Sequence, residues 1–128
     1  MAFTDIELNS GLAGFSISGL TLSKTALLTL EVASGSVTVH QTGSTYTLAT
    51  AQDHSFTADA TNSKKVFMGL IDNGTTTDLW VDSYIDDGNT QRAAPPSGYN
   101  LIREIAWFDL AANETDLDNS TIYRRAYI

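Results

Sequence analysis

Cysteine is absent from this chain of 128 residues, and proline occurs only twice. Without cysteine the chain can form neither a disulfide framework nor a cysteine-based metal site or nucleophile, so packing alone must hold the fold. No segment approaches the roughly 18 apolar residues that span a bilayer, and the first residues lack the pattern of a signal peptide. We therefore expect a protein made in a cytoplasm, with no membrane partner.

Basic residues are scarce. Seven Lys and Arg stand against 15 Asp and Glu, which gives a net charge of −8 and a pI near 4.3. A protein that binds nucleic acid needs clustered Lys and Arg to neutralise phosphates, so this composition argues against that partner. The four arginines all lie in the last third of the chain, at Arg92, Arg103, Arg124 and Arg125.

Catalytic groups are also few, since His40 and His54 are the only histidines. His40 ends an alternating strand and His54 follows a turn, which is typical of surface imidazoles. Ser97 lacks the nucleophile-elbow pattern, because a proline stands where the first glycine should be. We expect no catalytic residues and no enzyme activity.

The acidic residues around the expected central hairpin indicate structural roles. Asp72, Asp86 and Asp87 fall in expected turns, where Asp bonds the local backbone. Asp78 and Asp82 share one face of a strand. The segment 86–91 lacks the alternating order of a calcium loop, so we expect no metal and no cofactor.

Apolar residues alternate mostly with a period of two, which predicts strands. The pattern predicts a strand at 15–20 and a hairpin in which 26–32 and 36–40 flank a turn at 33–35. Short strands follow at 45–49 and 54–58. The segments 65–72 and 79–85 form the expected central hairpin around Asn73-Gly74, and 120–128 is the last strand.

The segment 99–110 fits two structures. Its aromatic and β-branched residues favour a strand, whereas Leu101, Ile102, Ile105 and Phe108 also fit a helical stripe. We interpret it as a strand.

About nine or ten short strands predict an all-β fold, an antiparallel β-sandwich of jelly-roll type, with a barrel as the alternative. Residues 13–128 are expected to form a single domain. Residues 1–12 are expected to form an N-terminal arm, because Asn9-Ser10-Gly11 separates them from the rest.

Eight aromatic residues have two interpretations: they line a sugar-binding face, or they are buried in the core. We interpret most of them as core or inter-sheet residues, because burial of aromatics is a main source of stability in a small sandwich. The set comprises Phe67, Trp80, Tyr84, Tyr99, Trp107, Phe108, Tyr123 and Tyr127.

The segment Ala94-Pro95-Pro96-Ser97-Gly98-Tyr99-Asn100-Leu101-Ile102-Arg103-Glu104-Ile105 follows the central hairpin and a polar loop. The prolines restrict the backbone and Gly98 allows a positive φ before the strand begins. This second half of the chain resembles a module of tailed-bacteriophage virion proteins, in which a Pro-Ser-Gly-Tyr turn leads into a strand.

The resemblance implies a structural virion protein. A chain of this length with its own Met1 is expected to be too short for a whole fibre, which favours a capsid decoration or cement protein. Such a protein would be a homotrimer whose partner is the major capsid protein or another virion protein. Interface or turn residues would be Pro95, Pro96, Ser97, Gly98 and Tyr99, with Phe3, Ile6 and Leu8 from the arm. The alternatives are a tail fibre or spike component, or a carbohydrate-binding module that recognises a receptor glycan.

Overall fold

The structure, a computed structural model, describes residues 3–9 and 14–126. These residues form eleven strands and a short 3₁₀ helix. No helix in this described part of the chain is long and apolar enough to cross a membrane. The elements are β1 (Thr4–Asn9), β2 (Phe15–Gly19), β3 (Leu22–Ala26), β4 (Thr29–Val32), β5 (Gly35–Val39), β6 (Ser44–Leu48), β7 (Gln52–Ser55), β8 (Lys64–Asp72), β9 (Thr77–Ile85), β10 (Asn100–Leu110), η2 (Leu117–Asn119) and β11 (Thr121–Ala126).

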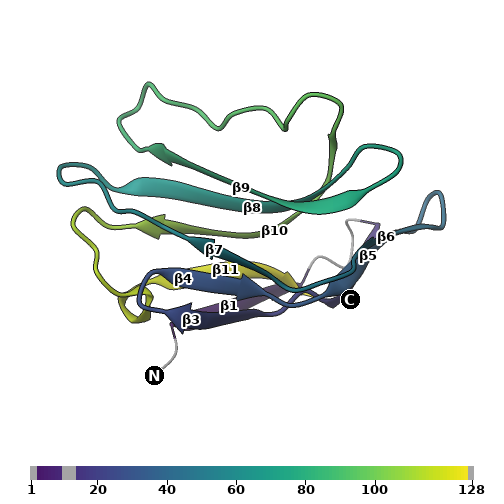
Figure 1. The fold of residues 1–128 in the computed structure, drawn as a ribbon, viewed down its shortest axis with the longest axis horizontal. Helices are drawn as coiled ribbons and strands as arrows, with labels where there is room; N and C mark the ends of the chain where they lie inside the picture. The colour runs from purple at the N-terminus through teal and green to yellow at the C-terminus, as the bar shows by residue number, and fades with distance from the viewer. Residues whose placement is uncertain (1–2, 10–13, 127–128) are drawn as a thin grey trace.

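One layer is a five-stranded sheet in the order β1-β11-β10-β8-β9. It runs from β9 at the top of Figure 1 to β1 near the bottom. Strands β8 and β9 form the predicted central hairpin, which is confirmed. Its turn is fixed by Asp72, whose Oδ2 accepts a hydrogen bond from the backbone N–H of Gly74 at 2.8 Å. The first and last strands, β1 and β11, pair in parallel.

The segment that fitted both a strand and a helix is strand β10, which confirms the strand prediction. It pairs with β8 on one side and β11 on the other. Two irregularities interrupt its register, between Leu101 and Arg103 and between Glu104 and Ala106. Each shifts the alternation of side chains by one residue, so apolar positions recur at a spacing that imitates a helix.

The other layer is a meander of three long strands that bend in the middle. The register continues from β2 into β3, from β5 back into β4, and from β6 into β7. The bend divides the meander into two three-stranded sheets, β2-β5-β6 and β3-β4-β7. In Figure 1, β5 and β6 lie at the right of the molecule and β3 and β4 at the left.

The predicted hairpin around 33–35 is wrong. Strands β4 and β5 do not pair with each other, and the hairpin turn lies earlier, between β3 and β4. Residues 33–35 instead form part of the bend, where Gly19 pairs with Gly35. A Cβ on Gly35 would lie 2.3 Å from the Ser18 carbonyl oxygen, so glycine is needed there for close backbone approach. The strand predicted at 54–58 also lies earlier, as β7.

A single core joins the two layers. Leu30, Val32 and Val37 of the meander are fully buried and belong to the same apolar cluster as Met68 and Leu70 of the five-stranded sheet. Each such side chain contributes about 1.5–3 kcal/mol through burial. The all-β sandwich predicted from the sequence is therefore confirmed.

Within the segment predicted as an arm, Thr4–Asn9 form β1 and pair with β11. Phe3 is 7% exposed and belongs to the core cluster. Residues 1–2 and 10–12 lie outside the described residues.

Candidate binding face

The outer surface of the five-stranded sheet carries a row of aromatic side chains, which we call the aromatic face: Phe67, Trp80, Tyr84, Trp107 and Tyr123. Strand register places Tyr123 beside Trp107 and Trp107 beside Phe67. The rings of Trp107 and Tyr123 stack with centroids 5.8 Å apart and an interplanar angle of 15°. Phe67 meets Trp80 edge to face at 5.5 Å. These contacts hold the rings in fixed orientations.

Gly69 makes room for this packing. A Cβ at that position would lie 2.9 Å from Cε1 of Phe67 and 2.7 Å from Cδ1 of Leu101. The Phe67 ring therefore lies across a strand position that has no side chain of its own.

The loop between β9 and β10 covers part of the aromatic face. The guanidinium of Arg92 lies 4.0 Å from the centre of the Phe67 ring. The backbone N–H of Ala93 donates to Asp82 Oδ2 at 2.9 Å, which fixes the loop to β9. Asp87 accepts from the backbone N–H groups of Asn89 and Thr90, the turn role predicted for it, and these bonds lower the pKa of its carboxyl. Phe67 is consequently 5% exposed although it lies on the outer surface.

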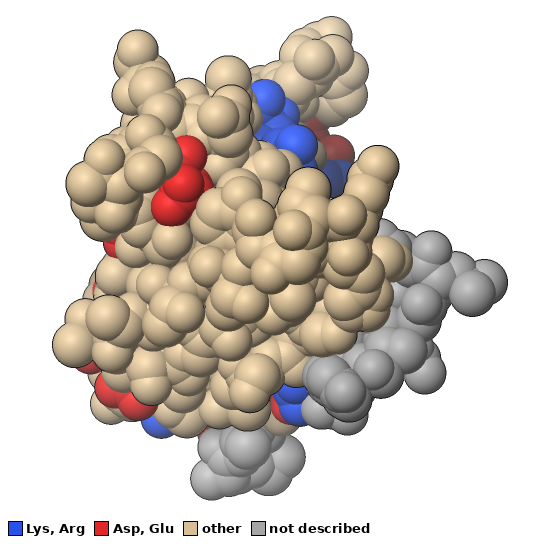
Figure 2. Space-filling model, turned by 90° about the vertical axis from the view of Figure 1, so that its right-hand side faces the viewer, with Lys and Arg blue, Asp and Glu red and all other residues tan. Residues whose placement is uncertain are grey.

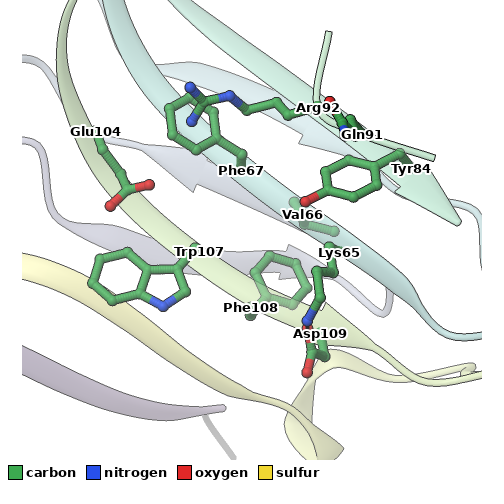
Figure 3. A pocket seen from close by; sticks show the side chains of 10 residues that line it. All are labelled: Lys65, Val66, Phe67, Tyr84, Gln91, Arg92, Glu104, Trp107, Phe108 and Asp109. Carbon is green, nitrogen blue, oxygen red and sulfur yellow. Dashed lines mark hydrogen bonds and ion pairs between the residues drawn. The ribbon is translucent and has the colours of Figure 1, made fainter. Parts of the chain in front are cut away.

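A cleft of about 420 Å³ opens between this loop and strand β10. In Figure 3 the Trp107 ring and the Glu104 carboxylate lie on one side, and Arg92 lies across Phe67. The Tyr84 hydroxyl points toward the centre of the cleft. The residues that line it are Lys65, Val66, Phe67, Tyr84, Gln91, Arg92, Glu104, Trp107, Phe108 and Asp109.

Charges of both signs surround the rings. Arg125 Nη2 donates to Glu104 Oε1 at 3.2 Å, and its guanidinium lies 4.8 Å from the centre of a Trp107 ring. Lys65 Nζ lies 3.2 Å from Asp109 Oδ1, and the hydrogen bond to Asp109 is the main cause that raises the pKa of Lys65. The cleft thus combines apolar ring surface with both hydrogen-bond donors and acceptors.

A second cleft of about 350 Å³ lies beside the first, and Lys65, Trp107, Phe108 and Asp109 line both. Its other side is the loop that contains η2. Glu114 lies there, and a hydrogen bond from the Asn119 side chain is the main cause that lowers the pKa of its carboxyl. Together the two clefts extend the hollowed surface along β10.

No protein-family model and no curated protein matches the sequence. The chain does share its fold with a phage gene product. A crystal structure of the gene 22 product of the Bacillus subtilis SPP1 phage superposes with a TM-score of 0.67. The match covers 98% of this chain and 92% of that chain at 12% sequence identity. At this identity the likeness shows the fold, and its coverage includes the sheet that carries the aromatic face.

The residues predicted for the interface lie apart from the clefts. Tyr99 donates its backbone N–H to the Pro96 carbonyl at 3.0 Å, and Gly98 has a φ of +87°. Residues Pro95–Tyr99 line neither cleft. Ile6 pairs with Tyr123 at the edge of the aromatic face, and Leu8 pairs with Arg125.

The core interpretation of the aromatic residues holds for Phe108, which belongs to the core cluster. Phe67 is also buried, but on the outer surface beneath Arg92. The core interpretation is wrong for four others, which are half-buried on the outer surface because the inward positions of their strands are taken by aliphatic residues and Phe108: Trp80, Tyr84, Trp107 and Tyr123. Tyr127 lies outside the described residues. Sequence reasoning missed Arg92 and Glu104, which line the cleft from a loop and beside a register shift in β10. It also missed Arg125 of β11, which contacts the cleft residues Glu104 and Trp107.

One histidine has a serine partner. Ser16 Oγ and His40 Nε2 share a hydrogen bond on an exposed surface. The strands that flank this pair, β2, β5 and β6, contain no Asp or Glu that could orient the imidazole as a triad requires. His54 packs against Phe56, and burial lowers its pKa. Among the described residues, no three His, Asp or Glu side chains group as a metal site would need.

Proposed function

We propose that this chain is a virion protein of a tailed phage, and that it acts by binding and not by catalysis. Its place would be the capsid surface, where it would serve as a decoration or cement protein that binds the major capsid protein. Both the resemblance of its second half to phage virion modules and the fold it shares with the SPP1 gene 22 product support this proposal.

The observation that carries the proposal is the composition of the aromatic face. Trp, Tyr and Arg are the residue types that dominate binding energy in protein interfaces. Here Trp107 and Tyr123 are stacked on each other, and Arg125 is held both by Trp107 and by Glu104. Because these side chains are already ordered, a partner would lose little conformational entropy when it binds them.

Phage particles that lack the protein provide the test. We expect such particles to survive heating or osmotic shock less well, and added wild-type protein to restore them. Trp107→Ala should weaken attachment by about 30-fold or more, as loss of a central interface residue does. Leu27→Ala is the control, since Leu27 is 60% exposed and lies on the β3–β4 turn, away from the aromatic face. Fully stable particles without the protein would refute the cement role.

A receptor-binding module for carbohydrate is the second candidate, and the cleft itself favours it. Its volume of about 420 Å³ falls in the range of small-ligand pockets, roughly 300–1,000 Å³. Aromatic ring surface beside carboxylates, as at Trp107 and Glu104, can pack against a sugar ring and accept from its hydroxyls.

The two tryptophans allow a direct test of this second candidate. Host surface glycans should quench tryptophan fluorescence saturably in the wild type and in Trp80→Phe, but not in Trp107→Phe. Absence of saturable quenching would exclude the glycan role and leave the cement proposal standing.

A further inference from the structure

One end of the sandwich carries no charged side chain on its strands. Residues 8–23 and 32–52 contain no Asp, Glu, Lys or Arg, although the chain has a net charge of −8. Strands β2, β5 and β6 fall within these segments and form one sheet. Figure 2 shows this end as a broad uncharged surface with charged groups at its margins.

The outward side chains of this sheet are all short hydroxyl residues. Ile17, Val37 and Leu48 point into the core, so the alternate positions face outward. We call this surface the hydroxyl face, and it comprises Ser16, Ser18, Ser36, Thr38, Thr45 and Thr47. Ser18, Thr45 and Thr47 are exposed, and Thr38 Oγ1 and Thr45 Oγ1 are hydrogen-bonded at 2.9 Å.

The other half of the same meander carries charged residues at its outward positions. The sheet β3-β4-β7 is built from the same three long strands, yet its outward positions include Glu31 and Asp53, which are paired in register. Like charges paired across strands are unfavourable, and solvent exposure makes them tolerable. The outward side of the meander therefore accepts charged residues in one of its two sheets. Solvent exposure does not explain why the other sheet, which carries the hydroxyl face, has none.

Hydroxyl groups are self-complementary. Each Ser or Thr hydroxyl is one donor and two acceptors, so a surface of hydroxyls can bond a copy of itself in many orientations. A contact between identical chains needs such a surface, because the same patch or a neighbouring patch must serve both partners. Short side chains also lose less rotamer entropy on ordering than Lys or Glu would.

We propose that the hydroxyl face is the contact between copies of this chain in solution. Each copy carries a charge of −8, so copies repel wherever acidic surfaces approach. On the hydroxyl face, two sheets can meet without opposing carboxylates, because strands β2, β5 and β6 contain no Asp or Glu. This proposal does not depend on the virion role, since the aromatic face lies on the other layer.

Light scattering after size exclusion tests the proposal. We expect the wild-type chain to have the mass of two or more copies; the trimer implied by the resemblance would satisfy this. Association should strengthen as salt rises from about 10 to 150 mM, because the Debye length falls from about 30 to 8 Å. Thr45→Asp with Thr47→Asp should reduce the mass to one chain, with an unchanged circular dichroism spectrum.

A lysine variant separates a buried contact from general charge repulsion. Thr45→Lys makes the chain less acidic, so it should strengthen association if net charge alone governs it, and weaken association if the hydroxyl face is buried. Thr25→Asp, at an exposed threonine of β3, is the matched control and should leave the mass unchanged. A monomeric wild type, or an oligomer that survives both Thr45 variants, would overturn the proposal.

Discussion

Lys24 links parts of the chain that lie far apart in sequence. Its Nζ lies 2.8 Å from Asp116 Oδ1 and 2.9 Å from Asp118 Oδ2, at the start of η2. The same loop is held by Leu117, whose backbone N–H donates to the Leu27 carbonyl and whose side chain is fully buried. Lys24 therefore helps to fasten the loop between β10 and β11 onto the β3–β4 hairpin.

This contact predicts a pH dependence of stability. The hydrogen bond from Lys24 lowers the pKa of Asp116 below its ordinary value of 3.8, and the bond to Asp116 raises the pKa of Lys24. The carboxylate then stabilises the fold above its ordinary pKa, and this contribution is lost as pH falls through the lowered pKa. Lys24→Met should lower Tm at neutral pH and make the decline of Tm between about pH 5 and pH 3 shallower.

Circular dichroism melts across that pH range provide the measurement. Lys64→Met is a suitable control, because Lys64 Nζ donates to the Thr57 carbonyl at 2.7 Å, and the pKa of the nearby Asp59 is lowered mainly by backbone hydrogen bonds from Asn62 and Thr61, with the charge of Lys64 as the smallest cause. An equal pH slope for Lys24→Met and the wild type would contradict the predicted role of the pair. The sequence alone does not predict the pairing of Lys24 with Asp116, because the two residues are 92 positions apart and no local pattern relates them.

At the scale of elements, the bend in the meander is the feature that sequence misplaced. Ala33-Ser34-Gly35 has the small residues of a turn, while the true turn at Leu27 and Leu28 is apolar. Local composition cannot distinguish a turn from a bend at which two strands cross closely, because glycine serves both. By contrast, the β8–β9 hairpin carries Asp72-Asn73-Gly74, whose side chains bond the backbone locally, and sequence located it correctly.

The bend also predicts the effect of a single methyl group. Gly35→Ala would place Cβ 2.3 Å from the Ser18 oxygen and 2.5 Å from the Leu20 nitrogen, both of them backbone atoms. Since backbone cannot rotate away as a side chain can, we expect a loss of about 3 kcal/mol in the free energy of unfolding. Urea denaturation would measure it. Ser34→Ala, at the exposed neighbour, should change that free energy by about 0.5 kcal/mol or less, and equal stability of the two variants would refute the argument.

For the whole molecule, composition and period-two patterning were sufficient to predict a β-sandwich, but not its strand order. The partner of β1 is β11, and this pairing depends on residues at opposite ends of the sequence. The aromatic face likewise depends on which strands become neighbours. Tyr123 stacks on Trp107 because β10 and β11 pair, and the two register shifts in β10 place Glu104 near Arg125.

The shared core predicts cooperative unfolding. One apolar cluster includes residues of both layers. Separation of the two layers would therefore expose buried apolar side chains of both. Tryptophan fluorescence reports the five-stranded sheet through Trp80 and Trp107, whereas far-ultraviolet circular dichroism reports all strands. We expect the two signals to give coincident denaturation curves. Separate midpoints would show that the meander and the five-stranded sheet unfold independently.

The parallel pairing of β1 with β11 has a mechanical consequence. Six residue pairs join these strands, from Thr4 with Thr121 to Asn9 with Ala126, and Arg124 Nε donates to both carboxylate oxygens of Asp5 at 3.0 and 2.9 Å. The start of β1 and the end of β11 therefore lie at opposite ends of the ladder. Tension applied between those two points would pull the strands past each other lengthwise, so that the rungs bear the load together instead of opening one after another.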